Sequence, residues 1–205
     1  MTASVFSGGL SKRVIGAAVE ALRAGELIIY PTDTIYGIGC DLKNLKALGK
    51  LNKLKNRLRH KPFSFICNNL SEAAKYADIT DAAYRLMRKF LPGPYTFVLP
   101  KGEGVPKKMT SADHAVGIRI PDHQVPLAIV SELGSPIITT SVNVSTEEPL
   151  CAIGDLSPEF RAAVAVVIDG GPLENTASTV IDFSGELPRV IREGKGYEEI
   201  GPYLS

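Results

Sequence analysis

The 205-residue sequence is poor in the residues from which metal sites and nucleophilic triads are built. Its three cysteines and three histidines are Cys40, Cys67, Cys151, His60, His114 and His123. An odd number of widely spaced cysteines argues against a disulfide framework and against a zinc knuckle. The sequence also shows no Ser/His/Asp or Cys/His arrangement, so we predict neither a resident metal nor a covalent nucleophile.

Long apolar runs are missing as well. No stretch approaches the roughly 20 residues of a membrane-spanning helix, and the N-terminal segment MTASVFSGGLSKR lacks the apolar core of a signal peptide. These absences predict a cytoplasmic protein without a membrane partner. No repeat, low-complexity tract or linker-like stretch divides the chain, which favours a single domain with a core of its own.

The glycine-rich signatures of nucleotide binding are also missing. There is no Gly-x-x-x-x-Gly-Lys-[Ser/Thr] loop, and Gly37-Ile-Gly39 lacks the third glycine of a dinucleotide fingerprint. A nucleotide bound by this chain would therefore be held by side chains rather than by a glycine cradle.

Charge, in contrast, is concentrated in one segment. Residues 43–61 hold eight of the 23 basic residues and none of the 22 acidic ones, so the rest of the chain carries a net charge of −7. Basic residues recur there at helical spacing opposite a leucine stripe. They are Lys43, Lys46, Lys50, Lys53 and Arg57, against Leu45, Leu48, Leu51 and Leu54. The pattern leaves two interpretations open, a solvated surface helix or a positive field that attracts a nucleotide or RNA.

The end of this segment places four cations on alternate residues, Lys55, Arg57, Arg59 and Lys61. In an extended chain they would share one face, and such a row favours an anionic ligand. Far downstream, Ser141-Val-Asn143 supplies a hydroxyl and a carboxamide suited to orienting phosphate or carboxylate oxygens. Together the two segments predict a site for a polyanionic small molecule, most simply a nucleotide.

Helical and strand patterns alternate along the whole chain, which predicts an α/β protein. Helices are expected between the cap Ser11 and the stop Gly25, through the basic segment, and over residues 71–76, 81–90 and 125–133. Strands are expected over residues 27–30, 63–67, 95–99, 115–120, 136–140, 165–169, 179–182 and 189–192. Strand–helix–strand units imply parallel pairing, and the short gaps between the last strands imply antiparallel pairing as well.

Seven motifs, in order, resemble those of the YrdC/YciO-like family, whose best-known members are L-threonylcarbamoyladenylate synthases. They are Tyr30-Pro-Thr-Asp-Thr-Ile-Tyr-Gly-Ile-Gly39, Lys55-x-Arg57 with Lys61-Pro62, Pro92-Gly-Pro-Tyr-Thr96, Gly117-Ile-Arg-Ile-Pro121, Thr140-Ser-Val-Asn143, Ser178-Thr-Val180 and Ile191-Arg-x-Gly194. The resemblance covers about residues 10–195 and leaves 196–205 as a C-terminal tail. It implies a single domain with a twisted, open mixed sheet and helices on its faces.

The resemblance also implies a reaction. L-Threonine and bicarbonate form a carbamate, which attacks the α-phosphate of ATP to give threonylcarbamoyl-AMP and pyrophosphate, with Mg²⁺ accompanying the triphosphate. The product supplies the threonylcarbamoyl-transferase machinery that modifies adenosine 37 of tRNA. Bringing two negative reactants together requires a cationic site rather than a covalent intermediate.

Site residues carry over by resemblance. Lys55 and Arg57 would be the catalytic pair, and ATP would be bound by Lys55, Arg57, Ser141, Asn143 and Arg192. Threonine would be held by Thr32, Arg119, Thr139 and Ser178, with Arg119 as the partner of its carboxylate. An alternative stays open for the small hydroxyls, because such groups at strand ends often bond only to backbone.

Two positions depart from the family pattern. Leu58 follows Arg57 where proline is usual, and Ile66 stands where synthases usually place a histidine; the stretch from Phe63 to Cys67 looks more like the YciO branch. An apolar wall at Ile66 predicts weak selection among amino acids. The alternative function is binding of double-stranded RNA or tRNA with weak or altered nucleotide chemistry, through Lys50, Lys53, Arg59 and Lys61. Residues 43–61 hold no aromatic side chain, which argues against a reader of single-stranded RNA.

Overall fold

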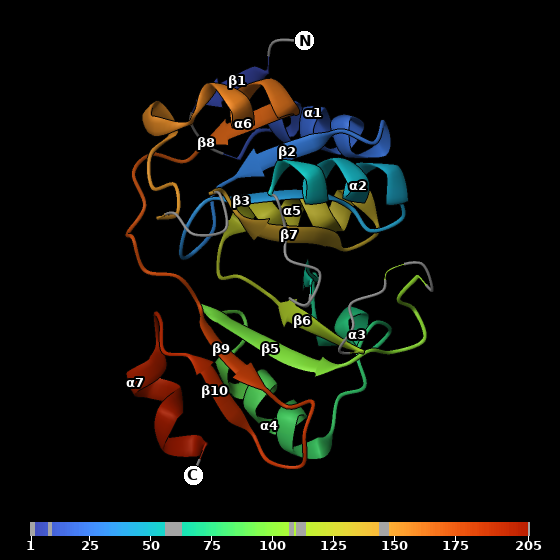
Figure 1. Ribbon diagram of the computed structural model, residues 1–205, viewed down its shortest axis with the longest axis vertical. Coiled ribbons are helices and arrows are strands. Elements are labelled where there is room, and N and C mark those ends of the chain that lie inside the picture. The colour runs from blue at the N-terminus through green and yellow to red at the C-terminus, as the bar shows by residue number, and fades with distance from the viewer. Residues whose placement is uncertain are drawn as a thin grey trace.

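The computed structural model describes residues 3–7, 10–55, 63–106, 109, 114–143 and 148–204. In this part of the chain ten strands form one mixed sheet, in the order β1-β8-β2-β3-β7-β4-β6-β5-β9-β10 (Figure 1). They are β1 (Ser4–Ser7), β2 (Leu27–Tyr30), β3 (Gly37–Asp41), β4 (Ser64–Ile66), β5 (Tyr95–Pro100), β6 (Ala115–Arg119), β7 (Ile137–Ser141), β8 (Val164–Asp169), β9 (Thr179–Asp182) and β10 (Arg189–Arg192). The sheet contains both parallel and antiparallel pairs, as predicted.

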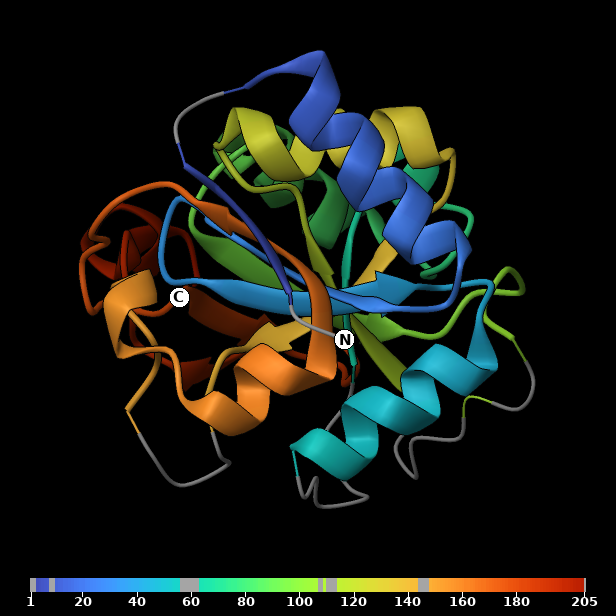
Figure 2. The same ribbon diagram turned by 90° about the horizontal axis from the view of Figure 1, so that it is seen from above.

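Helices cover both faces of this sheet. They are α1 (Lys12–Arg23), α2 (Leu45–Leu54), α3 (Leu70–Ala73), α4 (Asp81–Phe90), α5 (Gln124–Leu133), α6 (Pro158–Ala163) and α7 (Tyr197–Ile200). Seen from above, α1 and α5 lie together on one face, and α2 and α6 lie on the other (Figure 2). The predicted fold class, an open mixed sheet with helices on its faces, is confirmed. None of the helices described is both long and apolar enough to cross a membrane.

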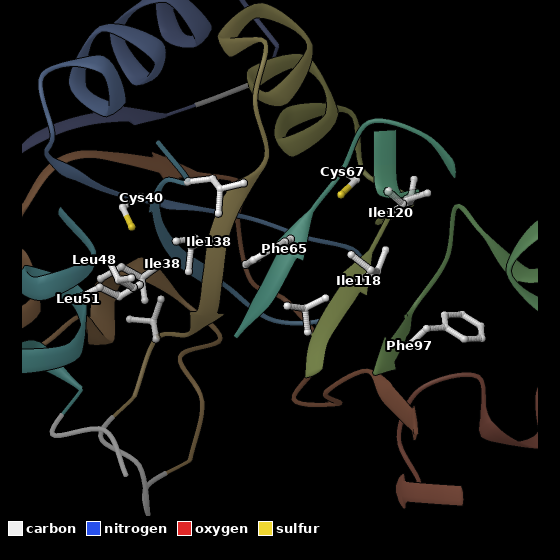
Figure 3. Close-up of a cluster of buried hydrophobic side chains, with 14 of the residues drawn as sticks. Ile38, Cys40, Leu48, Leu51, Phe65, Cys67, Phe97, Ile118, Ile120 and Ile138 are labelled. Carbon is white, nitrogen blue, oxygen red and sulfur yellow. The ribbon is translucent and has the colours of Figure 1, made fainter. Parts of the chain in front are cut away.

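Strand alternation separates the core into two hydrophobic clusters. In β4 the side chain of Phe65 joins the cluster on the α2 side, together with Phe97 and Ile118 (Figure 3). The next residue, Ile66, joins the cluster beneath α1 and α5, beside Ile137. Both faces of the middle of the sheet are therefore buried, and a site must lie where the helices leave a face uncovered.

The basic helix α2 lies on the surface. Asn44 caps its start by accepting a hydrogen bond from Ala47 N at 3.0 Å, while Leu48 and Leu51 of the predicted leucine stripe are buried and Leu45 is exposed. Lys50 pairs with Glu26 at 2.7 Å, with both side chains more than 40% exposed. The solvated-helix interpretation therefore accounts for the position of this helix.

The chain around Lys55 differs from the prediction. Lys55 is the C-cap of α2 with right-handed helical dihedral angles, φ −82° and ψ −8°, and so is not in an extended segment. Arg57, Arg59 and Lys61 lie outside the described residues. The prediction that Lys55 begins an extended row of alternating cations is therefore wrong, because Lys55 is the C-terminal cap of α2.

Two segments outside residues 10–195 pack onto the sheet. Strand β1 pairs in parallel with β8. After Gly196, α7 buries Ile200 completely, and the ring of Tyr203 contacts that of Phe90 at 5.4 Å between centroids. The residues expected to form a tail therefore belong to the packed structure, because they bring their own apolar side chains to it.

Candidate functional site

A cavity of about 490 Å³ opens on the sheet, and every strand from β3 to β10 in the sheet order contributes to its lining. Its polar lining consists of two arginines and a set of hydroxyls: Arg119, Arg192, Ser64, Thr96, Thr139, Thr140, Ser141 and Ser178. Tyr36 and aliphatic residues, among them Val98, Val180 and Ile191, complete the wall. Within the described lining no residue is acidic, so the cavity is chemically a site for an anion.

Strand register explains why residues so far apart in sequence meet here. Gly37 lies opposite Ser141, Thr139 opposite Ser64, and Ser64 opposite Gly117. Because side chains of paired residues point to the same face, these positions share one face across β3, β7, β4 and β6, with hydroxyl side chains on β7 and β4 and glycines on β3 and β6. We call them the polar row. The motifs from different parts of the sequence thus become one surface.

Arg119 provides the buried cation of the cavity. Its Nη2 donates to Asp33 Oδ1 at 2.9 Å and to Thr34 Oγ1 at 3.1 Å, while Nε is buried and has no partner among the described residues. Burial lowers the pKa of Arg119, and the charge of Asp33 opposes that shift. A buried N–H without an acceptor is costly, so a carboxylate or phosphate oxygen bound beside Nε would be stabilised.

Arg192 provides a second cation on the exposed edge strand β10. Its Nε and Nη2 donate to the carbonyl oxygen and to Oγ of Ser178, at 2.9 and 3.0 Å, and Thr96 Oγ1 lies 2.9 Å from the same Ser178 Oγ. Partial burial and then repulsion from Arg119 lower the pKa of Arg192. Both arginines line the same cavity, and an anion bound there would lessen the repulsion between them.

The lysine and Ser-x-Asn motifs meet beside the cavity. Lys55 Nζ donates to the carbonyl oxygens of Ser141 (2.7 Å) and Asn143, and to Asn143 Oδ1 at 2.8 Å. Ser141 Oγ donates to the same Oδ1 at 2.6 Å. Only 3% of Lys55 is exposed. With at least three protein acceptors for its three N–H groups, Lys55 holds the Ser-x-Asn segment in shape.

Tyr36 joins the cavity wall to the turn after β8. Its hydroxyl donates to the carbonyl oxygen of Gly171 at 2.7 Å and accepts from Gly170 N at 2.9 Å. Burial raises the pKa of Tyr36 to about 12, so the phenol stays protonated at neutral pH. Gly171 has φ +84°, a conformation that favours glycine. This wall is therefore fixed before any ligand binds.

A model of a protein family described as "Telomere recombination", covering Sua5, YciO and YrdC, matches residues 20–194. The chain belongs to the Sua5/YciO/YrdC family. The resemblance inferred from the motifs is thereby confirmed.

Individual relatives extend this result. Over 195 residues, 94% of each chain, the protein is 31% identical to the Escherichia coli K12 "Uncharacterized protein YciO". The crystal structure of E. coli YciO matches 98% of this chain and all of its own with a TM-score of 0.91. A putative threonylcarbamoyl-AMP synthase of Methanocaldococcus jannaschii is 36% identical over 185 residues, 89% of this chain and 86% of that one.

A solved family member carries an amino acid. The structure of P. abyssi Sua5 complexed with L-threonine matches 98% of this chain with a TM-score of 0.89 and 29% identity. This chain spans 60% of the length of that protein.

Most site residues carried over from the family lie at the cavity. Arg119, Thr139, Ser178, Ser141 and Arg192 line it, and Lys55 and Asn143 lie directly behind Ser141. Arg57, with Arg59 and Lys61, is outside the described residues. Lys50 and Lys53 are exposed on α2 and are not among the lining residues.

Two expectations from the sequence are corrected. Thr32 does not line the cavity: its hydroxyl donates to the carbonyl oxygen of Ile35 at 2.6 Å and accepts from Thr34 N at 3.1 Å, so it shapes its own loop. Ile66 does not form an apolar wall of the site either. It is fully buried beneath α1 and α5, because these helices cover that part of β4.

Three residues of the site were missed by sequence reasoning. Asp33 holds Arg119 with one carboxylate oxygen and accepts from Asp122 N at 3.1 Å with the other. Thr96 and Ser64 line the cavity. Asp33 and Thr96 belong to two of the seven family motifs. Ser64 is a single polar residue in an otherwise apolar strand, and this isolated position was the signal that could have identified it.

Proposed function

We propose that the protein is an ATP-dependent synthase that makes threonylcarbamoyl-AMP from L-threonine, bicarbonate and ATP. The observation that carries the proposal is that two arginines, Arg119 and Arg192, line one cavity whose described lining is rich in hydroxyls and has no acid. Such a site attracts a ligand with more than one anionic group. A carboxylated amino acid together with a nucleotide has that character.

The relatives support this choice. One is named a putative threonylcarbamoyl-AMP synthase, and another was solved with L-threonine bound. In the proposed arrangement Arg119 receives the carboxylate of threonine, with Nε as the available donor. The phosphates lie toward Ser141, Asn143 and Arg192, with Lys55 behind Ser141. The family resemblance assigns Arg57 to the same phosphates.

The chemistry then follows from positioning. The carbamate oxygen attacks the α-phosphorus of ATP, a new P–O bond forms, and the bond to the β-phosphate breaks to release pyrophosphate. Negative charge accumulates on the α-phosphoryl oxygens during this step, and fixed cations and hydroxyl donors stabilise it without reorganisation. No protein nucleophile is needed.

Mg²⁺ would enter on the phosphates. The described residues contain no group of three or more His, Cys, Asp or Glu side chains that could hold a metal ion. Mg²⁺ typically binds through substrate phosphates and water with few protein ligands, and it would reach this site together with the triphosphate. When bound, the ion neutralises phosphate charge, while the residues of this chain orient the two substrates.

The test is an assay of the purified protein with ATP, bicarbonate and each standard amino acid in turn. We expect threonine-dependent release of pyrophosphate and a product with the mass of threonylcarbamoyl-AMP. The product would supply the threonylcarbamoyl-transferase machinery acting on tRNA. Pyrophosphate release that does not depend on threonine, or formation of AMP alone, would contradict the proposal.

A second candidate function rests on the exposed face of α2. Lys43, Lys46, Lys50 and Lys53 are all exposed there, and a face of this kind suits contact with the phosphate backbone of double-stranded RNA or tRNA. Binding of a duplex that weakens steeply with salt and is lost when two of these lysines become glutamine would favour it.

A further inference from the structure

The side chain of Tyr30 crosses a neighbouring strand and ends at the cavity. Tyr30 lies on β2, its hydroxyl donates to Thr139 Oγ1 on β7 at 2.6 Å, and β3 runs between these two strands. Tyr30 is fully buried in the cluster beneath α1 and α5, whereas Thr139 belongs to the polar row and lines the cavity. One hydrogen bond therefore links the covered core to the site.

Two glycines of β3 make room for this crossing. Gly37 is the register partner of Tyr30, and Gly39 is that of Thr139. A Cβ atom on Gly37 would lie 3.0 Å from Tyr30 Cε2 and 3.2 Å from Thr139 Oγ1. A Cβ atom on Gly39 would lie 3.2 Å from the hydroxyl oxygen of Tyr30. The Gly37-Ile-Gly39 motif thus lets the phenol pass across the strand, because glycine carries no side chain there.

The direction of the hydrogen bond is fixed. Burial raises the pKa of Tyr30, while the bond to Thr139 and the charge of Arg119 oppose that shift, so the phenol stays protonated at neutral pH. A phenol has a single hydrogen to donate, and Tyr30 donates it to Thr139. Thr139 Oγ1 is therefore the acceptor, and among the described residues its own hydrogen has no acceptor.

This remaining hydrogen is available to a ligand of the cavity. Only 5% of Thr139 is exposed, and it is exposed on a cavity whose described lining has no acidic side chain. A carboxylate or phosphate oxygen accepts strongly from such a hydroxyl. For Thr139 the partner within the protein is a side chain, so the alternative that this hydroxyl bonds only to backbone does not hold.

We propose that Tyr30 is a positioning residue that presents the hydroxyl of Thr139 to an anionic oxygen of the substrate. The inference rests on the proposed function, in which threonine or its carbamate binds in this cavity. Tyr30 is not among the lining residues and acts only through Thr139. Without the phenol, Thr139 Oγ1 can accept from water and turn its hydrogen elsewhere, so the donor is no longer preorganised.

The experiment begins with Tyr30→Phe, which keeps the ring and removes the hydroxyl. The matched control is Tyr95→Phe, since Tyr95 is also buried and donates to the carbonyl oxygen of Gly196 at 3.1 Å, away from the cavity. By calorimetry, Tyr30→Phe should raise the Kd for L-threonine by about two- to tenfold, and Tyr95→Phe should leave it unchanged. Wild-type threonine affinity in folded Tyr30→Phe would overturn the inference.

A set of backgrounds at position 139 separates positioning from general support of the core. In Thr139→Val no hydroxyl is left to position, so adding Tyr30→Phe should cause no further loss of threonine affinity. In Thr139→Ser the hydroxyl is retained, so Tyr30→Phe should cause the same loss as in wild type. Thermal unfolding establishes that each variant is folded. An equal loss from Tyr30→Phe in all three backgrounds would overturn the inference, because the phenol would then act independently of Thr139.

Steady-state kinetics give a second readout that a merely structural role would not produce. In Tyr30→Phe the KM for threonine should rise while the KM for ATP stays unchanged. A rise of both KM values by the same factor would indicate a distorted fold and would also overturn the inference.

Calorimetry separates this inference from the proposed function. If wild type releases no pyrophosphate but binds threonine with the expected dependence on Tyr30 and Thr139, the proposed reaction fails and the positioning role stands. If threonine-dependent synthesis occurs and Tyr30→Phe keeps the wild-type KM for threonine, the reaction stands and the positioning role fails. A wild-type protein that binds no threonine overturns both.

Discussion

Two neighbouring rows of residues lie on the same face of the sheet and share strands β7, β4 and β6. In one row Thr139, Ser64 and Gly117 are register partners; in the other, Ile137 and Ile66 lie beside Arg119. The first row forms the floor of the cavity. The aliphatic members of the second are fully buried beneath α1 and α5.

The difference shows that burial beneath the helices, rather than the strand to which a residue belongs, determines whether a position on this face is apolar or polar. Where helices cover the face, burying an isoleucine stabilises the fold by roughly 1.5–3 kcal/mol. One residue pair further along, the same face opens onto the cavity, and Thr139 and Ser64 line it. Arg119 is the exception, a cation in the covered row whose charge is balanced by Asp33.

The largest effect on this contrast between the two rows is expected from a substitution of Arg119. Arg119→Met leaves the carboxylate of Asp33 buried without its cation, and breaking a buried pair in this way should lower the free energy of unfolding by about 3–5 kcal/mol. It should also abolish threonine binding. Urea denaturation and calorimetry measure the two effects.

A double variant separates these effects. Asp33→Asn combined with Arg119→Met removes both charges, so stability should be largely restored while threonine binding stays absent. The exposed Arg189, which pairs with Asp182, offers the control Arg189→Met, for which we expect normal threonine binding. Recovery of threonine binding together with stability in the double variant would show that Arg119 has only a structural role.

The second largest effect is expected in the covered row. Ile66→His places an imidazole where the side chain is fully buried among aliphatic residues, which should cost roughly 1–3 kcal/mol of folding stability. Since Ile66 does not line the cavity, activity with threonine should not rise. Ile66→Val is the matched control, with a cost of roughly 0.5–1.5 kcal/mol. A folded Ile66→His variant with raised threonine activity would instead show that this position reaches the site.

The strands and helices could largely be predicted because most are apolar runs between clear breakers. The bounds expected for residues 27–30, 81–90, 179–182 and 189–192 are those observed. The missed elements carry weak patterns. Strand β3 contains two glycines, and Gly39 is required because a Cβ there would lie 2.6 Å from the carbonyl oxygen of Ile138. β1 and α7 are four residues each, too short for a periodic signal.

Site residues could be predicted from the sequence where they belong to a family motif. They could not be predicted where the role of a residue depends on a partner far away in the sequence. The resemblance led to Arg119, Ser141 and Arg192, which line the cavity. It did not reveal that Lys55 is buried against Ser141 and Asn143, since those contacts join residues 86 and 88 positions apart. Likewise, the sequence could not show that Ser64 Oγ makes no hydrogen bond within the described residues, because this depends on its neighbours across the sheet.

The buried Lys55 gives a third prediction. Lys55→Ala and Asn143→Ala should each weaken ATP binding by roughly 1–3 kcal/mol, the usual cost of a lost charge-assisted hydrogen bond. Because the two side chains contact each other, the double variant should cost less than the sum. Lys53→Ala, exposed on α2, should leave ATP affinity unchanged. Calorimetric titration that finds strict additivity, or wild-type affinity in both single variants, would separate these residues from the nucleotide.

The smallest effect is expected at Asp182 on β9. Val98 in the cavity wall is the register partner of Asp182, a buried residue. Burial alone would raise the pKa of this carboxyl, but hydrogen bonds from Ser184 and Arg189 outweigh it, so the folded-state pKa is lowered.

A carboxyl with a lowered folded-state pKa contributes stability above its ordinary pKa of about 3.9 and loses that contribution as the pH falls through the lowered value. Asp182→Asn should therefore reduce stability at pH 7, by about 1 kcal/mol or less because Arg189 is largely exposed. The difference from wild type should narrow below about pH 4. Asp155→Asn serves as a control carboxyl elsewhere on the chain. Urea unfolding at a series of pH values measures this difference, and a stability difference that stays constant down to pH 2 would show that the carboxylate charge of Asp182 contributes nothing.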